Sequence, residues 1–320
     1  MILQLIPDKF MSIGAFVGIL FAFLATVVAT DKLCEFLPKD AGRDFAHDGK
    51  KSAGKPRGAG IIFVLAFVVA SILFVPFQME NLIYLGLIVI CMMTGFLDDA
   101  SKSPWGEYKK GFLDLCVAAL VAVTFLHYNS NTVELAMFDI TFTIHPVLFA
   151  ILTIILVWTS VNVTNCTDGV DGLSGTLTII SVMTIYLIDL MKDVAGDFSF
   201  MILLFAVCIL GYLWYNATPS RLMMGDAGSR AMGLFISIAI LKTGSPFLFI
   251  PVALVMILDG GLGILKVSLI RFLKIRIMKN IRTPLHDHVR KVWNWSNTQT
   301  VFRFAIIQII LAVATLYAIR

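Results

Sequence analysis

Four separate segments of this 320-residue chain carry acids, amides and imidazoles. They read GFLDD at 95–99, NVTNCTDGVDG at 162–172, MGDAGS at 224–229 and TPLHDH at 283–288. Oxygen ligands of this kind hold hard cations such as Mg²⁺, and histidine can donate to phosphate oxygens. Such groups together suit phosphoryl transfer, which depends mostly on positioning and charge stabilisation. The candidate residues are Asp98, Asp99, Asn162, Asn165, Asp168, Asp171, Asn216, Asp226, His286 and His288.

Basic residues near these segments complete the predicted site. Lys102, Lys109 and Lys110 follow the paired aspartates and can neutralise phosphate charge as point cations. The glycines of DGVDG and MGDAG let the backbone approach a ligand closely. Hard oxygen ligands with few cysteines point to Mg²⁺ or Mn²⁺ rather than zinc, and Mg²⁺ typically uses one or two carboxylates together with substrate phosphates.

The composition is that of a polytopic membrane protein. Of the residues 58% are hydrophobic and 14% are charged, and the mean hydropathy is +0.89, whereas a soluble domain has about 25% charged residues. The net charge of +4 is too small to indicate a nucleic-acid partner. The five cysteines are scattered and predict neither disulfides nor a zinc site. We expect one all-α domain over 1–320, without internal repeats.

Ten apolar stretches predict ten membrane-spanning helices. They fall near 11–30, 60–77, 82–97, 112–128, 146–161, 174–191, 200–215, 231–243, 247–270 and 301–319. The connections on one side, 31–59, 98–111, 162–173, 216–230 and about 266–303, hold 21 of the 25 Lys and Arg residues. The positive-inside rule then places these connections, and the active site, on the cytoplasmic face, with both termini outside.

Each polar segment alone has an ordinary explanation, because acids at helix ends can be solvated and DG pairs often form turns. Four such segments at one membrane depth favour a shared site. Intramembrane acids also mark ion-coupled transporters, whose sites lie near the bilayer midplane, commonly in paired halves. Here the acids gather at one face and the halves show no symmetry, which favours an enzyme that acts on a lipid phosphate.

The four motifs, in this order and at these spacings, resemble those of the polyprenyl-phosphate N-acetylhexosamine-1-phosphate transferases. The resemblance runs from about residue 50 to the C-terminus. The last loop and the ten-span plan favour the bacterial phospho-N-acetylmuramoyl-pentapeptide transferase branch over the N-acetylglucosamine-1-phosphate branch. A sibling that uses another UDP-N-acetylhexosamine is the main alternative.

The resemblance implies that phospho-MurNAc-pentapeptide passes from its UDP carrier to undecaprenyl phosphate, giving lipid I and UMP for peptidoglycan, with Mg²⁺ required. It implies a multi-pass protein of the bacterial inner membrane, and it suggests a homodimer, which no sequence feature shows. Asp98 and Asp99 match the family's catalytic aspartates, and Asp226 matches its magnesium-binding aspartate. The matches to the nucleotide pocket and to the phosphate-side lysines are Asn165, Asp168, Asp171, Asn216, Lys102 and one of Lys109 or Lys110.

Two segments depart from the family pattern. The usual three histidines are replaced by His286-Asp287-His288, and we expect Asp287 to orient a neighbouring histidine or to pair with Arg290 while both histidines face the substrate. The usual TPTMGG is replaced by KPRGAG at 55–60, where Lys55, Arg57 or the nearby Lys51 substitutes for the missing threonines. Two other features have open or structural interpretations: Asp259 is either a helix-break partner or a site residue, and 271–282 predicts a basic amphipathic surface helix.

Overall fold

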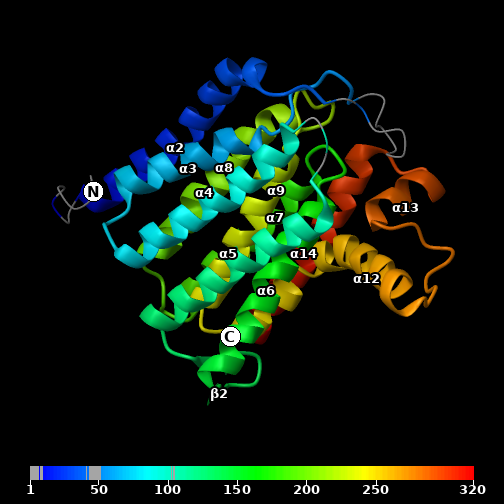
Figure 1. Ribbon diagram of the computed structural model, residues 1–320. Coiled ribbons are helices and arrows are strands. Elements are labelled where there is room, and N and C mark those ends of the chain that lie inside the picture. The colour runs from blue at the N-terminus through cyan, green and yellow to red at the C-terminus, as the bar shows by residue number, and fades with distance from the viewer. Residues whose placement is uncertain (1–6, 8–9, 41, 43–51, 102, 104) are drawn as a thin grey trace.

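Long apolar helices make up most of the structure, which is a computed structural model that describes residues 7, 10–40, 42, 52–101, 103 and 105–320 (Figure 1). The first half contains α2 (Met11–Leu33), η2 (Cys34–Phe36), α3 (Gly60–Phe74), α4 (Met79–Asp99), α5 (Glu107–Tyr128), β1 (Thr132–Leu135), β2 (Ile140–Thr143) and α6 (Pro146–Thr167). The second half contains α7 (Leu173–Met191), α8 (Asp197–Asn216), α9 (Gly225–Lys242), η3 (Pro246–Leu248), α10 (Phe249–Val252), α11 (Leu254–Met256), η4 (Ile257–Gly261), α12 (Leu262–Ser268), η5 (Leu269–Leu273), α13 (Leu285–Val292) and α14 (Asn297–Ala318).

Within the described residues, seven helices are long and apolar enough to cross a membrane, and an eighth span is possible if the bent segment from Pro246 to Leu273 counts as one. The seven are α2 with η2, α4, α5, α6, α7, α8 and α14. Their outward faces are apolar: Phe16, Leu24 and Ile310 are more than half exposed. An α-helix satisfies its own backbone hydrogen bonds, so it is one of the few structures that hydrocarbon accepts.

The other two predicted spans are α3 and α9. Helix α3 has 15 residues and is therefore about 22 Å long, which is less than the roughly 30 Å of a bilayer core. Helix α9 carries Asp226, Arg230 and Lys242, and every residue from Ala227 to Leu241 is buried. Neither helix meets the length and hydropathy of the other seven, so their status as spans stays a prediction.

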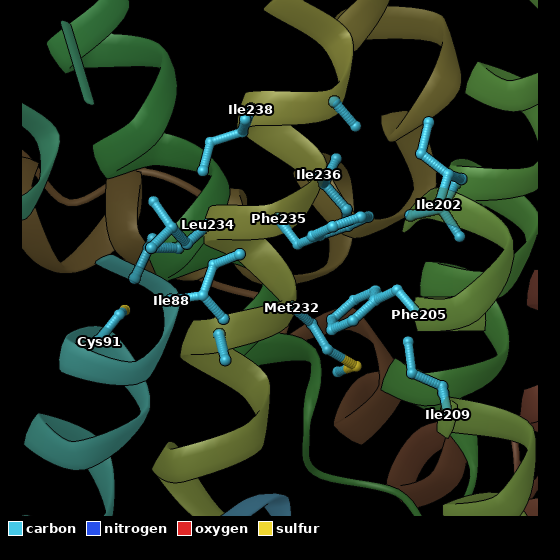
Figure 2. Packing of buried hydrophobic residues seen from close by; sticks show 14 of the residues in the cluster. Ile88, Cys91, Ile202, Phe205, Ile209, Met232, Leu234, Phe235, Ile236 and Ile238 are labelled. Carbon is cyan, nitrogen blue, oxygen red and sulfur yellow. The ribbon is translucent and has the colours of Figure 1, made fainter. Parts of the chain in front are cut away.

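Helix α9 is the central helix of this core. Its apolar side chains pack on both sides, against α4 and against α8 (Figure 2). The ring centroids of Phe235 on α9 and Phe205 on α8 lie 4.1 Å apart in a stacked arrangement. Because α9 is packed on all sides, its first turn has a fixed position relative to α4 and α6, and that turn carries Asp226.

The predicted span over 247–270 is not straight, because the segment bends by 71° between Val252 and Leu254. Pro251 has no N–H group, and a break frees further backbone groups that hydrocarbon cannot satisfy. Gln308 on α14 supplies the missing partners: its Nε2 donates to the carbonyls of Pro251 and Val252, and its Oε1 accepts from Val255 N. Helix α12 consequently leaves the bundle at an angle (Figure 1).

The predicted amphipathic helix over 271–282 is also wrong. Helical structure ends at Leu273, and Lys274 adopts a left-handed conformation with φ of 58°. The chain then folds back, and Lys266 Nζ donates to the carbonyls of Met278 and Ile281. The segment therefore packs against α12 as irregular chain instead of forming a helix.

The two ends of the bundle differ in character. The β1–β2 hairpin lies at one end, at the bottom of Figure 1, and α14 ends nearby. Helix α13 and residues 52–59, which lead into α3, lie toward the opposite end. All four polar motifs lie at this second end, at helix termini or in short loops.

Candidate active site

A close helix contact brings the paired aspartates of α4 to Asp226 of α9. A Cβ atom at Gly95 would lie 2.4 Å from the carbonyl carbon and oxygen of Asp226, so only glycine allows this approach. Asp226 lies in the first turn of α9, where the helix dipole favours a carboxylate. Asp98 and Asp99 end α4, where the dipole disfavours negative charge, so nearby cations have to compensate.

Lys110 on α5 supplies one of these cations. Its Nζ pairs with Asp98 Oδ2 and lies 3.3 Å from Asp226 Oδ2, so one ammonium group bridges two acids. The second oxygen of Asp98 accepts a hydrogen bond from Trp105 N at 2.7 Å. The carboxylate of Asp98 is thus held on both sides, and the residue is 7% exposed.

Arg57 supplies the other cation, from the loop before α3. Its Nη2 lies 2.8 Å from Asp99 Oδ1 and 3.9 Å from Asp226 Oδ1, and its Nη1 lies 3.5 Å from Asp40 Oδ1. Asp99 Oδ2 accepts from Ala227 N at 3.3 Å. Asp99 Oδ1 is buried and has no partner with hydrogen-bond geometry among the described residues, although the guanidinium is near.

A cavity of about 180 Å³ adjoins these groups. The predicted site residues that line it are Asn165, Asp168, Asp171, Asn216 and Asp226. Asn216 fixes the surrounding loops, because its Oδ1 accepts from Gly172 N at 2.8 Å and its Nδ2 donates to Leu222 O at 3.0 Å. Asp171 accepts from Ser220 N at 3.3 Å, and Asn165 donates to Ser229 at 2.9 Å.

Asp168, which follows the last residue of α6, has an unusual charge environment. Burial raises the pKa of its carboxyl group from 3.8 to about 7, and the charges of Asp226 and Asp99 add to this rise. The Arg57 guanidinium opposes it. A bound cation would therefore help Asp168 to lose its proton near neutral pH.

Other predicted residues lie apart from the acids. Asn162 donates to Trp158 O, one turn earlier on α6, and Lys109 Nζ lies 3.3 Å from the ring centroid of Trp105. Of the two lysines left open by the motif, Lys110 is the one that contacts the aspartates. Lys51 and Lys102 lie outside the described residues, so their predicted roles have no structural description.

The histidine motif forms the first turn of α13. His286 is 3% exposed, and its ring lies against the backbone of Gly169. Its Nδ1 and its backbone N are 2.8 and 2.7 Å from the two carboxylate oxygens of Asp259. Asp287 pairs with Arg290 at 3.9 Å, as one alternative predicted, and with Lys291 at 3.5 Å.

His288 points elsewhere. Its Nδ1 accepts from Arg282 N at 3.3 Å, and its ring meets that of Trp293 edge to face. Neither His286 nor His288 belongs to the cavity lining. The expectation that they face the substrate thus has no direct contact to support it.

Several residues of the site were not predicted as such. Asp40 and Arg290 line the cavity, and Arg57, predicted only as one of three alternatives, lines it as well. Arg290 follows His286 by four residues, and on a helix that spacing puts both side chains on one face. That spacing is the only available sequence signal, because the loop around Asp40 has no periodicity to interpret.

The donor set fits a magnesium ion. Asp99 Oδ1 is buried without a hydrogen-bond partner among the described residues, and Asp226 Oδ1 lies near the same nitrogen of Arg57, Nη2. Among the described residues, no three side chains of His, Cys, Asp or Glu converge as a complete metal site. Mg²⁺ does not need three, because it typically takes one or two carboxylates and completes its shell with phosphates and water.

Comparison with known proteins defines the class of this chain. Residues 81–244 match the model of glycosyl transferase family 4, and that range includes Asp98, Asp99 and Asp226. With its apolar helices, the chain is a multi-pass membrane protein of this class of glycosyl transferases.

Individual relatives narrow the class. The phospho-N-acetylmuramoyl-pentapeptide-transferase of Treponema pallidum subsp. pallidum (strain Nichols) is 38% identical over 300 residues, covering 88% of this chain and 82% of the relative. Proteins of the same name from Campylobacter jejuni (strain RM1221) and from a Nitratiruptor species are 29% and 27% identical. They cover 85% and 94% of this chain and 83% and 93% of the relatives. The chain belongs to the phospho-N-acetylmuramoyl-pentapeptide transferase family, as the four motifs predicted.

Proposed function

We propose that this protein transfers phospho-MurNAc-pentapeptide from its UDP carrier to undecaprenyl phosphate. An oxygen of the lipid phosphate attacks the phosphorus next to the sugar, the bond from that phosphorus to UMP breaks, and lipid I and UMP leave. The observation that supports this reaction best is the cluster of Asp98, Asp99 and Asp226 around two cationic side chains beside a cavity. The names of the relatives supply the sugar substrate.

The chain's own residues would divide the work between the two reacting phosphates. Lys110 holds Asp98 and Asp226 in place, and its ammonium group would also attract an arriving phosphate. Arg57 can pair with phosphate oxygens through its planar guanidinium. Asn165, Asp168, Asp171 and Asn216 surround the cavity and would receive the nucleotide. At pH 7 a phosphate monoester is already largely dianionic, since its second pKa is near 6, so no strong general base is required.

A magnesium ion would be held by Asp226, and Asp99 Oδ1, which shares the Arg57 contact with Asp226, could supply a second oxygen. When bound, it would neutralise the pyrophosphate charge that builds up during transfer. Arg57 and Lys110 already neutralise part of the acid cluster, so the aspartates can stay close together before a metal arrives.

For the membrane arrangement we propose ten spans, with α3, α9 and the bent segment as the three that complete the seven long helices. The site would face the cytoplasm of a bacterial inner membrane, and both termini would lie outside. The support is that 21 of the 25 Lys and Arg residues fall on the connections at the end that carries the motifs. A homodimer is proposed from family resemblance alone.

The experiment is a substrate comparison with purified protein in detergent. Undecaprenyl phosphate and Mg²⁺ are supplied with either UDP-MurNAc-pentapeptide or UDP-N-acetylglucosamine, and lipid products are identified by mass spectrometry. We expect lipid I only from the first substrate. A lipid-linked N-acetylglucosamine instead would assign the chain to a sibling reaction, and no lipid product from either substrate would reject the proposal.

A further inference from the structure

The pair of Asp259 and His286 takes no direct part in the proposed reaction. Asp259 lies in the π-helical turn η4, a rare element that often occurs at functional sites, and its side chain is completely buried. Its two oxygens accept from the backbone N and the ring Nδ1 of His286 at 2.7 and 2.8 Å. A carboxylate in this position fixes the ring orientation and holds the proton on Nδ1.

The other face of the imidazole meets the DGVDG loop. A Cβ atom built on Gly169 would lie 2.2 Å from His286 Nε2 and 2.7 Å from Cε1, so the ring lies directly against the glycine backbone. Arg290, one turn further along α13, donates from Nη1 to Gly169 O at 3.1 Å. The same short helix therefore holds Gly169 through two side chains.

Gly169 lies between this support and the cavity. Asp168, Gly169, Val170 and Asp171 all line the cavity, whereas His286 and Asp259 do not. His286 is 3% exposed, so its ring can affect the cavity by contact with Gly169, which covers it.

We propose that Asp259 and His286 are positioning residues that act through Gly169, and that they hold the DGVDG loop in the shape that receives the nucleotide. The role replaces the substrate-facing one that the sequence suggests for His286. It rests on the proposed function only for the identity of the ligand, because the mechanical link from Asp259 to His286 to Gly169 exists without any ligand.

The first test separates positioning from transition-state stabilisation. A residue that shapes the nucleotide site should affect KM for UDP-MurNAc-pentapeptide, whereas a donor used only in the transition state lowers kcat and kcat/KM equally. We expect His286→Ala to raise KM about 10-fold and to change kcat less than about 3-fold. His286→Asn keeps an N–H group that can donate to Asp259, so it should restore most of the wild-type KM. Val292→Ala, on the exposed side of α13, is the matched control.

The second test uses the contact with Gly169 and needs no turnover. Gly169→Ala should lower the unfolding temperature, because the new methyl group collides with the ring. In the double variant Gly169→Ala/His286→Ala the ring is gone, so the loss should be smaller than the sum of the two single losses. Unfolding is followed by intrinsic fluorescence in one detergent, without substrate.

The outcomes are distinct. The proposal is overturned if His286→Ala and His286→Asn both lose about 10² or more in kcat with unchanged KM, or if the Gly169 and His286 effects on unfolding simply add. Wild-type protein that makes no UMP would reject the proposed function, and the unfolding data would still decide whether the link through Gly169 exists.

Discussion

Lys110 Nζ lies 3.3 Å from Asp226 Oδ2 and joins the first turn of α5 to the first turn of α9, while the same ammonium group pairs with Asp98 at the end of α4. One turn deeper, Asp114 of α5 pairs with Arg230 of α9. Helix α5 carries Lys110 and then Asp114, and α9 carries Asp226 and then Arg230, so the two helices meet in two ion pairs.

Lys110 should matter more for turnover than its neighbour Lys109. Lys110→Ala leaves Asp98 and Asp226 without their shared cation, so we expect a loss of about 10²-fold in kcat/KM. Lys109 lies over the ring of Trp105, and its replacement by Ala should cost far less activity. Steady-state UMP release by both variants is the measurement. Equal losses would show that the ion pairs around Lys110 do not carry the effect.

The deeper pair should be coupled in stability. Asp114 is 6% and Arg230 3% exposed, and breaking a buried pair by removing one partner costs about 3–5 kcal/mol. Asp114→Leu or Arg230→Leu alone should therefore lower the unfolding temperature strongly. The double replacement should recover most of the loss, because a buried pair can be exchanged for apolar residues at little cost. Additive losses would mean that the two side chains act independently.

The acid at position 168 should make stability depend on pH. Because burial raises the pKa of Asp168 from 3.8 to about 7, the folded protein holds this proton more tightly than the unfolded chain. The stability that this proton provides is complete below pH 4 and is lost as the pH rises through 7. The amide of Asp168→Asn does not titrate, so this variant keeps its stability as the pH rises. Its unfolding temperature should therefore gain a few degrees relative to that of wild type between pH 5 and pH 8.

This comparison is made in metal-free buffer with EDTA, since a bound cation would favour the ionised form. Asp171→Asn, from the same loop, is the control. A difference between Asp168→Asn and wild type that stays constant over this range would show that Asp168 is ionised throughout.

Transfer should be direct, without a covalent enzyme intermediate. Both oxygens of Asp98 are engaged by Lys110 and Trp105 N, and those of Asp99 by Ala227 N and Arg57, so neither carboxylate has an oxygen free to attack phosphorus. Rapid-quench experiments with UDP-MurNAc-pentapeptide in the absence of lipid phosphate should detect no phosphorylated protein. Phospho-MurNAc-pentapeptide bound covalently to Asp98 or Asp99, with UMP released, would contradict this.

The acid cluster could be predicted because it follows from motifs and from the rule that alternate connections lie on one side of a membrane. The place of Arg57 could not. It depends on contacts of its loop with a distant one, in which Met223 N donates to Pro56 O and Ala59 N donates to Met223 O. No periodicity of the loop before α3 indicates these bonds.

The bend at Ala253 was unpredictable for a related reason. It is stabilised by Gln308, a polar residue on α14 more than fifty positions away, and hydropathy alone does not connect the two. Beyond the end of the helix at Lys274 the chain folds back so that Lys266 donates to the carbonyls of Met278 and Ile281. Sequence patterns report which helices are apolar, whereas these details depend on single side chains that meet in the folded chain.

The most direct measurement of the central claim is UMP release by purified wild-type protein and by Asp226→Asn at several Mg²⁺ concentrations, with and without undecaprenyl phosphate. We predict that wild-type release requires both the lipid phosphate and Mg²⁺. Asp226→Asn should unfold at a temperature close to that of wild type and lose about 10²–10³ in turnover at ordinary Mg²⁺. Near wild-type turnover by Asp226→Asn, or UMP release that needs no lipid phosphate, would contradict the account.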